Sequence, residues 1–420
     1  MLALLASLVP LLPAQTQAPE RPNVVLIISD DQAWGDFGFM GSDTIRTPHL
    51  DQLATEGLAF TRGYVPTALC RASLATLATG LYPHQHKITG NDPPRGTDRA
   101  LMLAHLAEVE TLPARLASAG YRSLQTGKWW EGSSAHGGFT AGMTHGDPTR
   151  GGRHGDEGLK IGRQTMEPAF DFIDECNREG TPFFLWYAPF LPHTPHNPPA
   201  RILETYTGQD VPLPIAKYQA MCTWFDETCG ALLDHLDEQG LTQDTLVVFV
   251  TDNGWIQKPG AQGYAPRSKR TPYEAGVRTP ILLRWPGQIQ PQSREVPVSS
   301  VDIVPTILTA CGLDAPATLP GVDLRTVGAT RAPIFGAAYT HDVVDIHDPA
   351  RSLLTRWVLR DPYKLLVHTD PNQPAELYDV RADPTEQTPL SKPETAASLR
   401  ALLDAWWPGK PTPPKAPEDD

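Results

Sequence analysis

The sequence has few cysteines and no surplus of basic residues. Its five cysteines form neither metal-ligand pairs nor a dense disulfide framework, and at most Cys222 and Cys229 could form a bridge. Acidic residues outnumber basic ones, 48 to 35, so the net charge is −13. Because a polyanion needs a basic face, this charge argues against nucleic acid as a partner. An acidic protein that handles an anionic ester needs cations placed locally, from lysines or a metal.

Long apolar runs are also lacking after the N-terminus. Residues 1–18, MLALLASLVPLLPAQTQA, resemble a secretory signal peptide, although no Lys or Arg precedes the apolar part. The alternative is a disordered N-terminus. The run is short and interrupted by Pro10 and Pro13, so we expect no membrane span. We expect export, to the periplasm or the extracellular space, and a disordered tail over 409–420.

The remaining 390 or so residues suffice for one large domain with a smaller one attached, about 19–335 and 336–408. Strands alternate with helices in the first part, including helices expected over 51–60 and 163–179. In the second part, strands follow one another without long crossover helices. This order predicts an α/β domain followed by an antiparallel sheet.

Two continuous apolar runs end in oxygen-bearing side chains. NVVLIIS at 23–29 precedes Asp30 and Asp31, and the strand expected over 245–250 precedes Asp252 and Asn253. Such runs are typical of strands buried on both faces of a parallel sheet, whose carboxyl ends form sites. If the strands are neighbours, the four oxygen ligands suit Ca²⁺, or Mg²⁺. Taken singly, each pair is also compatible with a tight turn or a solvated loop.

A cysteine opens the helix expected in LCRASLATLATGLYPHQH, residues 69–86. Leu74 and Leu77 follow Cys70 at helical spacing and share its face. Cys70 is therefore either a reactive group at a helix N-terminus or a small hydrophobic residue of the core.

Other candidates for chemistry lie in loops. Lys128 and Lys269 can neutralise the oxygens of a sulfate or phosphate, and His193, between two prolines, can protonate a leaving group. Each residue is also compatible with a plain surface position. A glycine-rich loop over 132–162 is long enough to be functional or mobile; its histidines are His136, His145 and His154. Four tryptophans, which stack on a sugar or pack in the core, are Trp34, Trp129, Trp130 and Trp255.

The order of motifs along the chain resembles the type I sulfatases of the alkaline phosphatase superfamily. The motifs are NVVLIISDD, CRAS with ATG and YPHQH behind it, GKW, PHTP, TDNG, KRTPYEAGVRTPILLRWPG and ELYDVRADPTE. The resemblance covers nearly the whole chain. It implies a large mixed sheet between helices with a small C-terminal antiparallel subdomain.

The resemblance also implies residue roles. Asp30, Asp31, Asp252 and Asn253 match calcium ligands, Lys128 and Lys269 match sulfate-binding lysines, and His193 matches the histidine near the leaving-group oxygen. Cys70 matches the cysteine that is oxidised to formylglycine. The hydrate of that aldehyde offers one hydroxyl to attack sulfur and a second to expel the sulfate.

Two positions depart from the family pattern. Leu74 stands where the maturation signal CxPxR or CxAxR has arginine, and Trp130 stands where the family has the histidine of GKWH. Arg71 cannot replace that arginine, because adjacent helix positions point about 100° apart. The departures indicate either inactivation or a coordinated change in which a histidine of the 132–162 loop enters the site.

Three functions stay open. The first is hydrolysis of sulfate esters of a small molecule or glycan, with formylglycine-generating machinery as a partner. The second is a related phosphoesterase or phosphonate hydrolase, since the same groups suit a phosphoryl oxyanion. The third is a non-catalytic protein that binds sulfated ligands.

Overall fold

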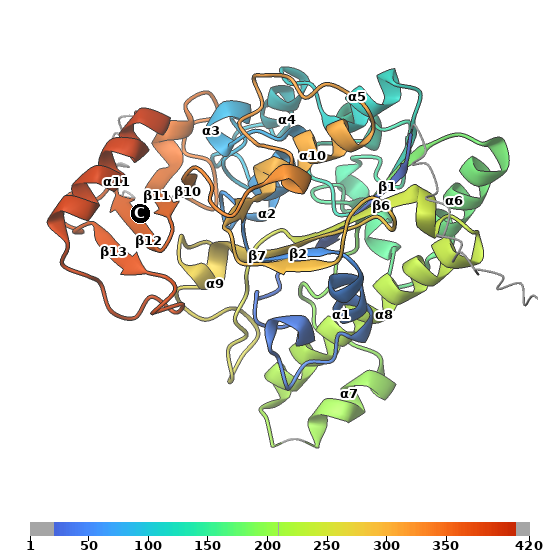
Figure 1. The fold of residues 1–420 in the computed structure, drawn as a ribbon, viewed down its shortest axis with the longest axis horizontal. Helices are drawn as coiled ribbons and strands as arrows, with labels where there is room; N and C mark the ends of the chain where they lie inside the picture. The colour runs from blue at the N-terminus through green and yellow to red at the C-terminus, as the bar shows by residue number, and fades with distance from the viewer. Residues whose placement is uncertain (1–20, 209, 409–420) are drawn as a thin grey trace, which may run out of the picture.

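The computed structural model describes residues 21–208 and 210–408, and it confirms the predicted fold. A large mixed sheet lies between helices, and a small antiparallel sheet lies at one end of the molecule (Figure 1). The predicted signal segment 1–18 and tail 409–420 lie outside the described residues.

The large sheet has the strand order β4-β3-β5-β1-β6-β7-β2-β8, and β9 also pairs with β2. From β4 to β6 the strands are parallel, whereas β7 runs antiparallel to both β6 and β2. The strands are β1 (Asn23–Ser29), β2 (Leu58–Tyr64), β3 (Arg122–Gly127), β4 (Ala141–Gly142), β5 (Phe183–Ala188), β6 (Thr245–Thr251), β7 (Arg278–Arg284), β8 (Gln292–Arg294) and β9 (Val298–Ser299).

Strand β1 lies in the middle of the sheet and contributes to both hydrophobic cores. Its alternate side chains point to opposite faces. Val24 and Leu26 pack into the core that contains α2, α5 and α10, and Val25 packs into the core that contains α1, α6 and α8. This burial on both faces explains the uninterrupted apolar sequence.

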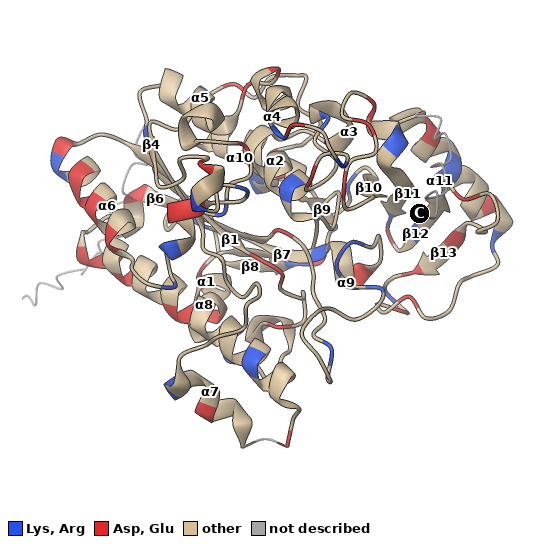
Figure 2. Ribbon diagram, turned by 180° about the vertical axis from the view of Figure 1, so that it is seen from behind, with Lys and Arg blue, Asp and Glu red and all other residues tan. Residues whose placement is uncertain are grey.

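Helices cover both faces of the sheet, as Figure 1 shows for α2, α5 and α10 on one face and α1 and α8 on the other. Acidic and basic residues are interspersed over the outer helices (Figure 2). The helices are α1 (Pro48–Glu56), α2 (Cys70–Thr79), α3 (Pro83–His86), α4 (Ala100–Ala107), α5 (Leu112–Ser118), α6 (Glu167–Glu179), α7 (Ala200–Thr207), α8 (Leu213–Glu238), α9 (Glu274–Val277), α10 (Ile303–Ala310) and α11 (Pro393–Trp406).

The small sheet is antiparallel and is covered by α11. Its strands are β10 (Ile334–Tyr339), β11 (Leu353–Arg360), β12 (Tyr363–His368) and β13 (Glu376–Asp379). A buried charge cluster joins this sheet to α9. Lys364 Nζ lies 3.0 Å from Glu274 Oε1 and 3.1 Å from Glu386 Oε1, and all three side chains are almost fully buried. Buried ion pairs therefore link the small sheet to the part of the chain that contains α9.

Several local expectations were wrong. The helix expected over 51–60 spans Pro48–Glu56, because Leu58 already begins an inner strand of the sheet. The helix expected from 163 begins at Glu167. The 132–162 loop is not structureless: it contains β4 and three 3₁₀ turns.

The suggested bridge between Cys222 and Cys229 does not form, and all five cysteines are free and buried. Both residues lie on α8, seven positions apart, which separates them by about 10 Å along the axis. A disulfide requires Cα atoms within about 7 Å. No helix among the described residues is long and apolar enough to cross a membrane.

Candidate active site

The ends of β1 and β6 bring the predicted acidic residues together. The two strands are parallel neighbours with Ser29 opposite Thr251, so the residues that follow both strands emerge at one edge. The Asp31 amide donates to Asp252 Oδ1 at 3.0 Å, and Asn253 Nδ2 donates to Asp31 Oδ1 at 2.7 Å. Asp31 adopts a left-handed backbone conformation, with φ of 64°.

The cluster of carboxylates has unused oxygens that fit a cation. Asp30 Oδ2 and Asp252 Oδ2 are buried and have no hydrogen-bond partner among the described residues. A buried, unpartnered carboxylate oxygen is costly unless a cation or a donor satisfies it. With Asp31 and the Asn253 side-chain oxygen, they offer the all-oxygen donor set that Ca²⁺ and Mg²⁺ use.

Two lysines reach the same carboxylates from other elements. Lys128 Nζ lies 2.6 Å from Asp30 Oδ1 and 3.7 Å from Asp252 Oδ2, and Lys269 Nζ lies 2.6 Å from Asp31 Oδ2. Burial alone lowers the pKa of Lys128, but the surrounding acidic groups, Asp30 first among them, together hold the pKa well above its usual value. Burial raises the pKa of Asp31, yet Lys269 and His193 bring it down to about 2. Both lysines are therefore charged.

Gly127 places Lys128 at the end of β3. The glycine has φ of +75°, and a Cβ on it would lie 1.8 Å from the Ala188 carbonyl oxygen. The Lys128 amide donates to that same oxygen at 2.7 Å. A side chain at position 127 is therefore excluded, because the backbone that aims Lys128 needs both the left-handed conformation and the close approach.

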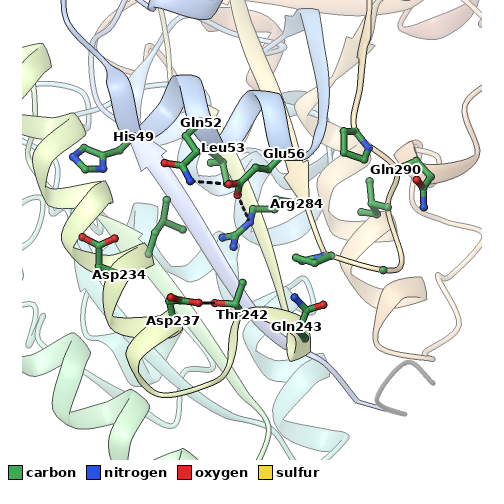
Figure 3. Close-up of a pocket in the computed structure, with 15 residues that line it drawn as sticks. His49, Gln52, Leu53, Glu56, Asp234, Asp237, Thr242, Gln243, Arg284 and Gln290 are labelled. Carbon is green, nitrogen blue, oxygen red and sulfur yellow. Dashed lines mark hydrogen bonds and ion pairs between the residues drawn. The ribbon is translucent and has the colours of Figure 1, made fainter. Parts of the chain in front are cut away.

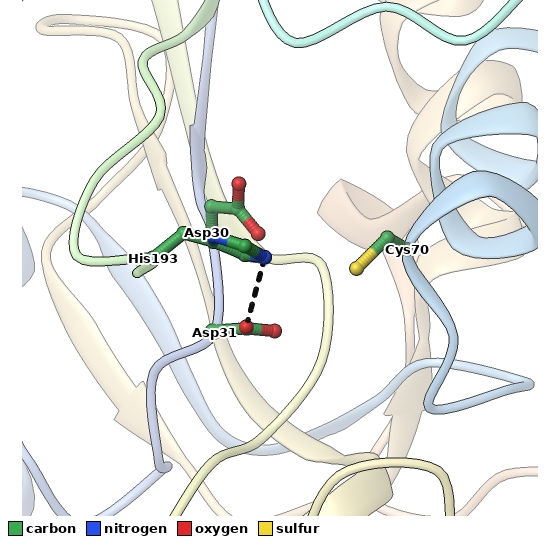
Figure 4. A group of neighbouring side chains, drawn as sticks. All are labelled: Asp30, Asp31, Cys70 and His193. Atoms are coloured by element: carbon green, nitrogen blue, oxygen red, sulfur yellow. Dashed lines mark ion pairs between the residues drawn. The ribbon is translucent and has the colours of Figure 1, made fainter. Parts of the chain in front are cut away.

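Cys70 faces the carboxylates from the opposite side, at the first turn of α2 (Figure 4). Its thiol donates to Asn253 Oδ1 at 3.6 Å. A ligand atom from each of Asp30, Asp31, Cys70 and His193 lies within 4.8 Å of the others. Burial raises the pKa of the Cys70 thiol to about 12, although the two lysines lower it. The protein's own groups thus leave the thiol protonated at neutral pH.

His193 lies beside Asp31, with Nε2 3.4 Å from Asp31 Oδ2 (Figure 4). Its Nδ1 lies 2.6 Å from the Thr194 carbonyl oxygen, which can only accept, so Nδ1 carries a proton. Burial lowers the pKa of His193 to about 4. In its neutral form the ring therefore presents an unprotonated Nε2 to the site.

The positions that depart from the family pattern are filled by packing. Leu74 is buried in the core on the α2 side of the sheet. Arg71 is buried too, and its Nε and Nη2 donate to the two carboxylate oxygens of Glu131 at 2.6 and 2.7 Å. The Arg71 guanidinium therefore does not take the place of the missing arginine.

Of the three loop histidines, His154 comes nearest to the site. Its ring packs edge-on against Trp130 at 5.3 Å and lies 5.3 Å from Phe190, which stacks on His193. Burial lowers the pKa of His154 to about 4, and Lys128 and Arg153 add to this effect. His136 instead contacts the Glu131 carbonyl oxygen. The amide of His145 donates to Asp156.

The four tryptophans serve different purposes. Trp129, Trp130 and Trp255 are at most 4% exposed. Trp129 packs edge-on against Trp186 in the core, which excludes it from stacking on a ligand. Trp34 is half-buried and carries the Arg278 guanidinium over its ring at 3.9 Å.

A cavity of about 610 Å³ lies elsewhere, and Figure 3 shows Gln52, Glu56 and Arg284 in its wall. Arg284 ends β7, and Gln243 precedes β6. Because β7 is antiparallel to β6, this cavity lies at the edge of the sheet opposite to Asp252. It contains none of the predicted site residues, so it is not the candidate active site.

Sequence reasoning missed several residues around the site. Asp92, Arg99 and Arg153 gather around Trp130, and Glu131 pairs with Arg71. No spacing signal marks them, because they lie in separate loops and meet only in the folded chain.

Comparison with known proteins decides the family. The family described as Sulfatase matches residues 22–313. The chain belongs to the sulfatase family, and with it to the sulfuric ester hydrolases. A second family, N-sulphoglucosamine sulphohydrolase, C-terminal, matches residues 263–405. The relatives include human arylsulfatase A, which is 30% identical over 364 residues, covering 74% of this chain and 69% of the relative.

Two solved structures support the fold. BT4656, solved in complex with its substrate D-glucosamine-2-N,6-O-disulfate, has a TM-score of 0.75 at 20% identity and covers 93% of this chain and 98% of its own. The phosphonate monoester hydrolase of Agrobacterium radiobacter has a TM-score of 0.66 at 20% identity, covering 92% and 95%. At these identities the likeness concerns the fold, which sulfatases share with a phosphonate hydrolase.

Proposed function

We propose that this sulfatase cleaves its ester through residue 70, with Cys70 converted to formylglycine, beside a divalent cation. Asp30, Asp31, Asp252 and Asn253 hold the cation. The observation that carries the proposal is the direction of Cys70: its sulfur lies 3.6 Å from Asn253 Oδ1, inside the group of side chains around Asp30 and Asp31. Residue 70 therefore lies where it would meet both a cation and an anion bound to the lysines.

Charge balance supports a cation of charge +2. The buried cluster contains three carboxylates, of Asp30, Asp31 and Asp252, and two ammonium groups, of Lys128 and Lys269. Without a cation the cluster has a net charge of −1, which repels an anionic ester. A bound Ca²⁺ or Mg²⁺ reverses the balance to one positive charge, matched to a sulfate monoester. When bound, such an ion supplies Lewis-acid polarisation.

The state of the thiol supports conversion of Cys70. Cysteine acts as a nucleophile in its thiolate form, and in the absence of a cation burial raises the pKa of this thiol to about 12, which leaves very little thiolate at neutral pH. A formylglycine at this position supplies, as its hydrate, one hydroxyl that attacks sulfur and a second that releases the sulfate. Cys70 opens α2, and the start of a helix favours a nearby anion, although the Arg71 amide of this turn already donates to Asn91 Oδ1.

The lysines and His193 bind and orient the ester. Lys128 and Lys269 are charged and lie on either side of the acidic cluster, where each can donate to a sulfate oxygen. His193 Nε2 points into the site and receives a proton before it can donate one to the leaving oxygen. Lys269 keeps its proton and acts as a fixed positive charge, because Asp31 and the other nearby groups raise its pKa above the usual value despite its burial.

We propose a sulfated small molecule or glycan as substrate, on the basis of the family. We also propose export of the protein, on the basis of the apolar N-terminal sequence.

Two measurements test the proposal. Mass spectrometry of the Cys70 peptide from the native host is expected to show formylglycine; an unmodified thiol in active protein refutes the formylglycine mechanism. Turnover of aryl sulfates is expected to exceed that of matched aryl phosphates and phosphonates. The reverse order would favour the phosphoesterase alternative, and binding without turnover of any ester would favour the non-catalytic alternative.

A further inference from the structure

Two arginines lie against the indole of Trp130 at the rim of the site. The guanidinium carbon of Arg153 lies 4.8 Å from the ring centroid, and that of Arg99 lies 5.4 Å from it. Lys128 Nζ lies 5.9 Å from the same centroid. Trp130 is itself buried. One aromatic ring thus connects the sulfate-binding lysine proposed above to a pair of guanidinium groups.

Asp92 holds both guanidinium groups in place. Arg99 Nη1 donates to Asp92 Oδ1 at 3.0 Å, Arg153 Nε donates to the same oxygen at 2.8 Å, and Arg153 Nη2 donates to Asp92 Oδ2. Arg99 is fixed further by the carbonyl oxygens of Asn91 and Arg153. Asp342 lies in one group with Asp92, so two carboxylates balance the two guanidinium charges, and Arg153 offers a ligand its directed N–H donors rather than a surplus of charge.

Arg153 has capacity left for a ligand. Its side chain is 44% exposed, against 25% for Arg99. Within residues 21–208 and 210–408, its Nη1 has no hydrogen-bond partner. Asp92 thus binds one edge of the planar guanidinium and the Trp130 indole packs against its face. The remaining N–H donors face outward.

The arginine pair is close to the proposed nucleophile. Asn91, which precedes Asp92, accepts a hydrogen bond of 3.1 Å from the Arg71 amide, and Arg71 follows Cys70. Cys70 is among the groups that raise the pKa of Arg153, after Asp92. The segment 91–92 therefore fixes both the start of α2 and the two arginines.

We propose that Arg153, held by Asp92 against Trp130 and supported by Arg99, binds a second anionic group of the substrate, a carboxylate or another sulfate near the ester that is cleaved. The inference rests on the proposed function and adds the substrate class: a sulfate ester with a neighbouring anion. Lys128, on the same indole, binds the sulfate that is removed. A guanidinium suits the second group because it offers paired donors to carboxylate or sulfate oxygens.

The test compares phenyl sulfate with its 2-, 3- and 4-carboxyphenyl analogues. For each protein, kcat/KM of a carboxylated ester is divided by kcat/KM of phenyl sulfate, so that general losses of activity cancel. We expect Arg153→Ala to lower this ratio about tenfold for the preferred isomer, the scale of one hydrogen bond between charged groups. Arg150→Ala is the matched control, because Arg150 belongs to the same loop but pairs with Glu157. Its ratio is expected to equal that of the wild type.

A binding measurement separates failure of this inference from failure of the proposed function. The same esters are titrated calorimetrically, with Ca²⁺ present, into Cys70→Ala and into Cys70→Ala/Arg153→Ala. A loss of preference for the carboxylated ester in the double variant supports the inference, even if the wild type hydrolyses neither ester. Ratios that Arg153→Ala leaves unchanged for all three isomers, in turnover or in binding, overturn it.

Discussion

Binding of a divalent cation at Asp30 and Asp252 is expected to raise the melting temperature of the protein. Each of the two carboxylates has a buried oxygen with no hydrogen-bond partner in the described part of the chain, although Lys128 Nζ lies 3.7 Å from that of Asp252, and the cluster has one surplus negative charge. A ligand at a hundred times its dissociation constant stabilises the fold by about 2.7 kcal/mol. The entropy of unfolding is about 2.1 cal/mol/K per residue, or about 0.9 kcal/mol/K for 420 residues. The expected rise is therefore about 3 °C.

The assay is calorimetric melting of chelator-treated protein, before and after addition of Ca²⁺ or Mg²⁺. Asp252→Asn removes one of the unpartnered oxygens and one charge, so its shift is expected to fall below about 1 °C. Asp171→Asn is the control, because Asp171 is exposed on α6 and belongs to no group of potential metal ligands among the described residues. This variant is expected to keep the full shift. An equal shift in wild type and Asp252→Asn, or none in wild type, would refute the reasoning.

Two further predictions concern stability. Glu131→Gln breaks the buried pair with Arg71 and is expected to cost about 3–5 kcal/mol in urea unfolding, because it leaves a buried guanidinium without its counter-charge. Glu157→Gln serves as control, because the Glu157 side chain is 30% exposed and its ion pair is reached by water, so the unfolding midpoint should change little; equal effects of the two substitutions would contradict this expectation. His84 stacks on Trp407, and burial lowers its pKa from 6.5 to about 4, so the unfolded chain binds more protons between these values and stability falls as the pH is lowered through them. His84→Phe keeps an aromatic ring and is expected to reduce this slope by the share of one group, since His154 and His193 have a similarly lowered pKa and keep their share; a slope identical to that of the wild type would show that His84 does not titrate in this range.

The sequence was informative where a strand and the site residues that directly follow it can be recognised from one continuous stretch. The β-branched run before Asp30 requires burial on both faces, and the same holds for the run before Asp252. Both strands could therefore be predicted, together with the edge at which their acidic residues emerge. That β1 and β6 are neighbours is a property of the folded sheet, because the two strands lie far apart in the sequence: β1 ends at Ser29 and β6 begins at Thr245.

The sequence was uninformative where distant loops meet. Asp92, Arg99 and Arg153 have no shared periodicity, and only the folding of the 132–162 loop over Trp130 brings them together. The end of α1 was misplaced for a related reason. The apolar residues from Leu58 to Phe60 are compatible with one more helical turn. They form a strand because they pair with β7.

The buried cluster of Lys364, Glu274 and Glu386 has a consequence for how this enzyme can be divided or rebuilt. Glu274 lies five residues after Lys269, on the segment that reaches the active site, while its partners come from the small sheet and the turn after it. A chain shortened before β10 would remove Lys364, the nearest counter-charge of Glu274, and would expose the apolar side chains of Tyr64, Val65 and Val277, which share a core with Trp357. The small sheet thus supports the segment that reaches the active site. A protein made of the large domain alone would need a substitute for the small sheet.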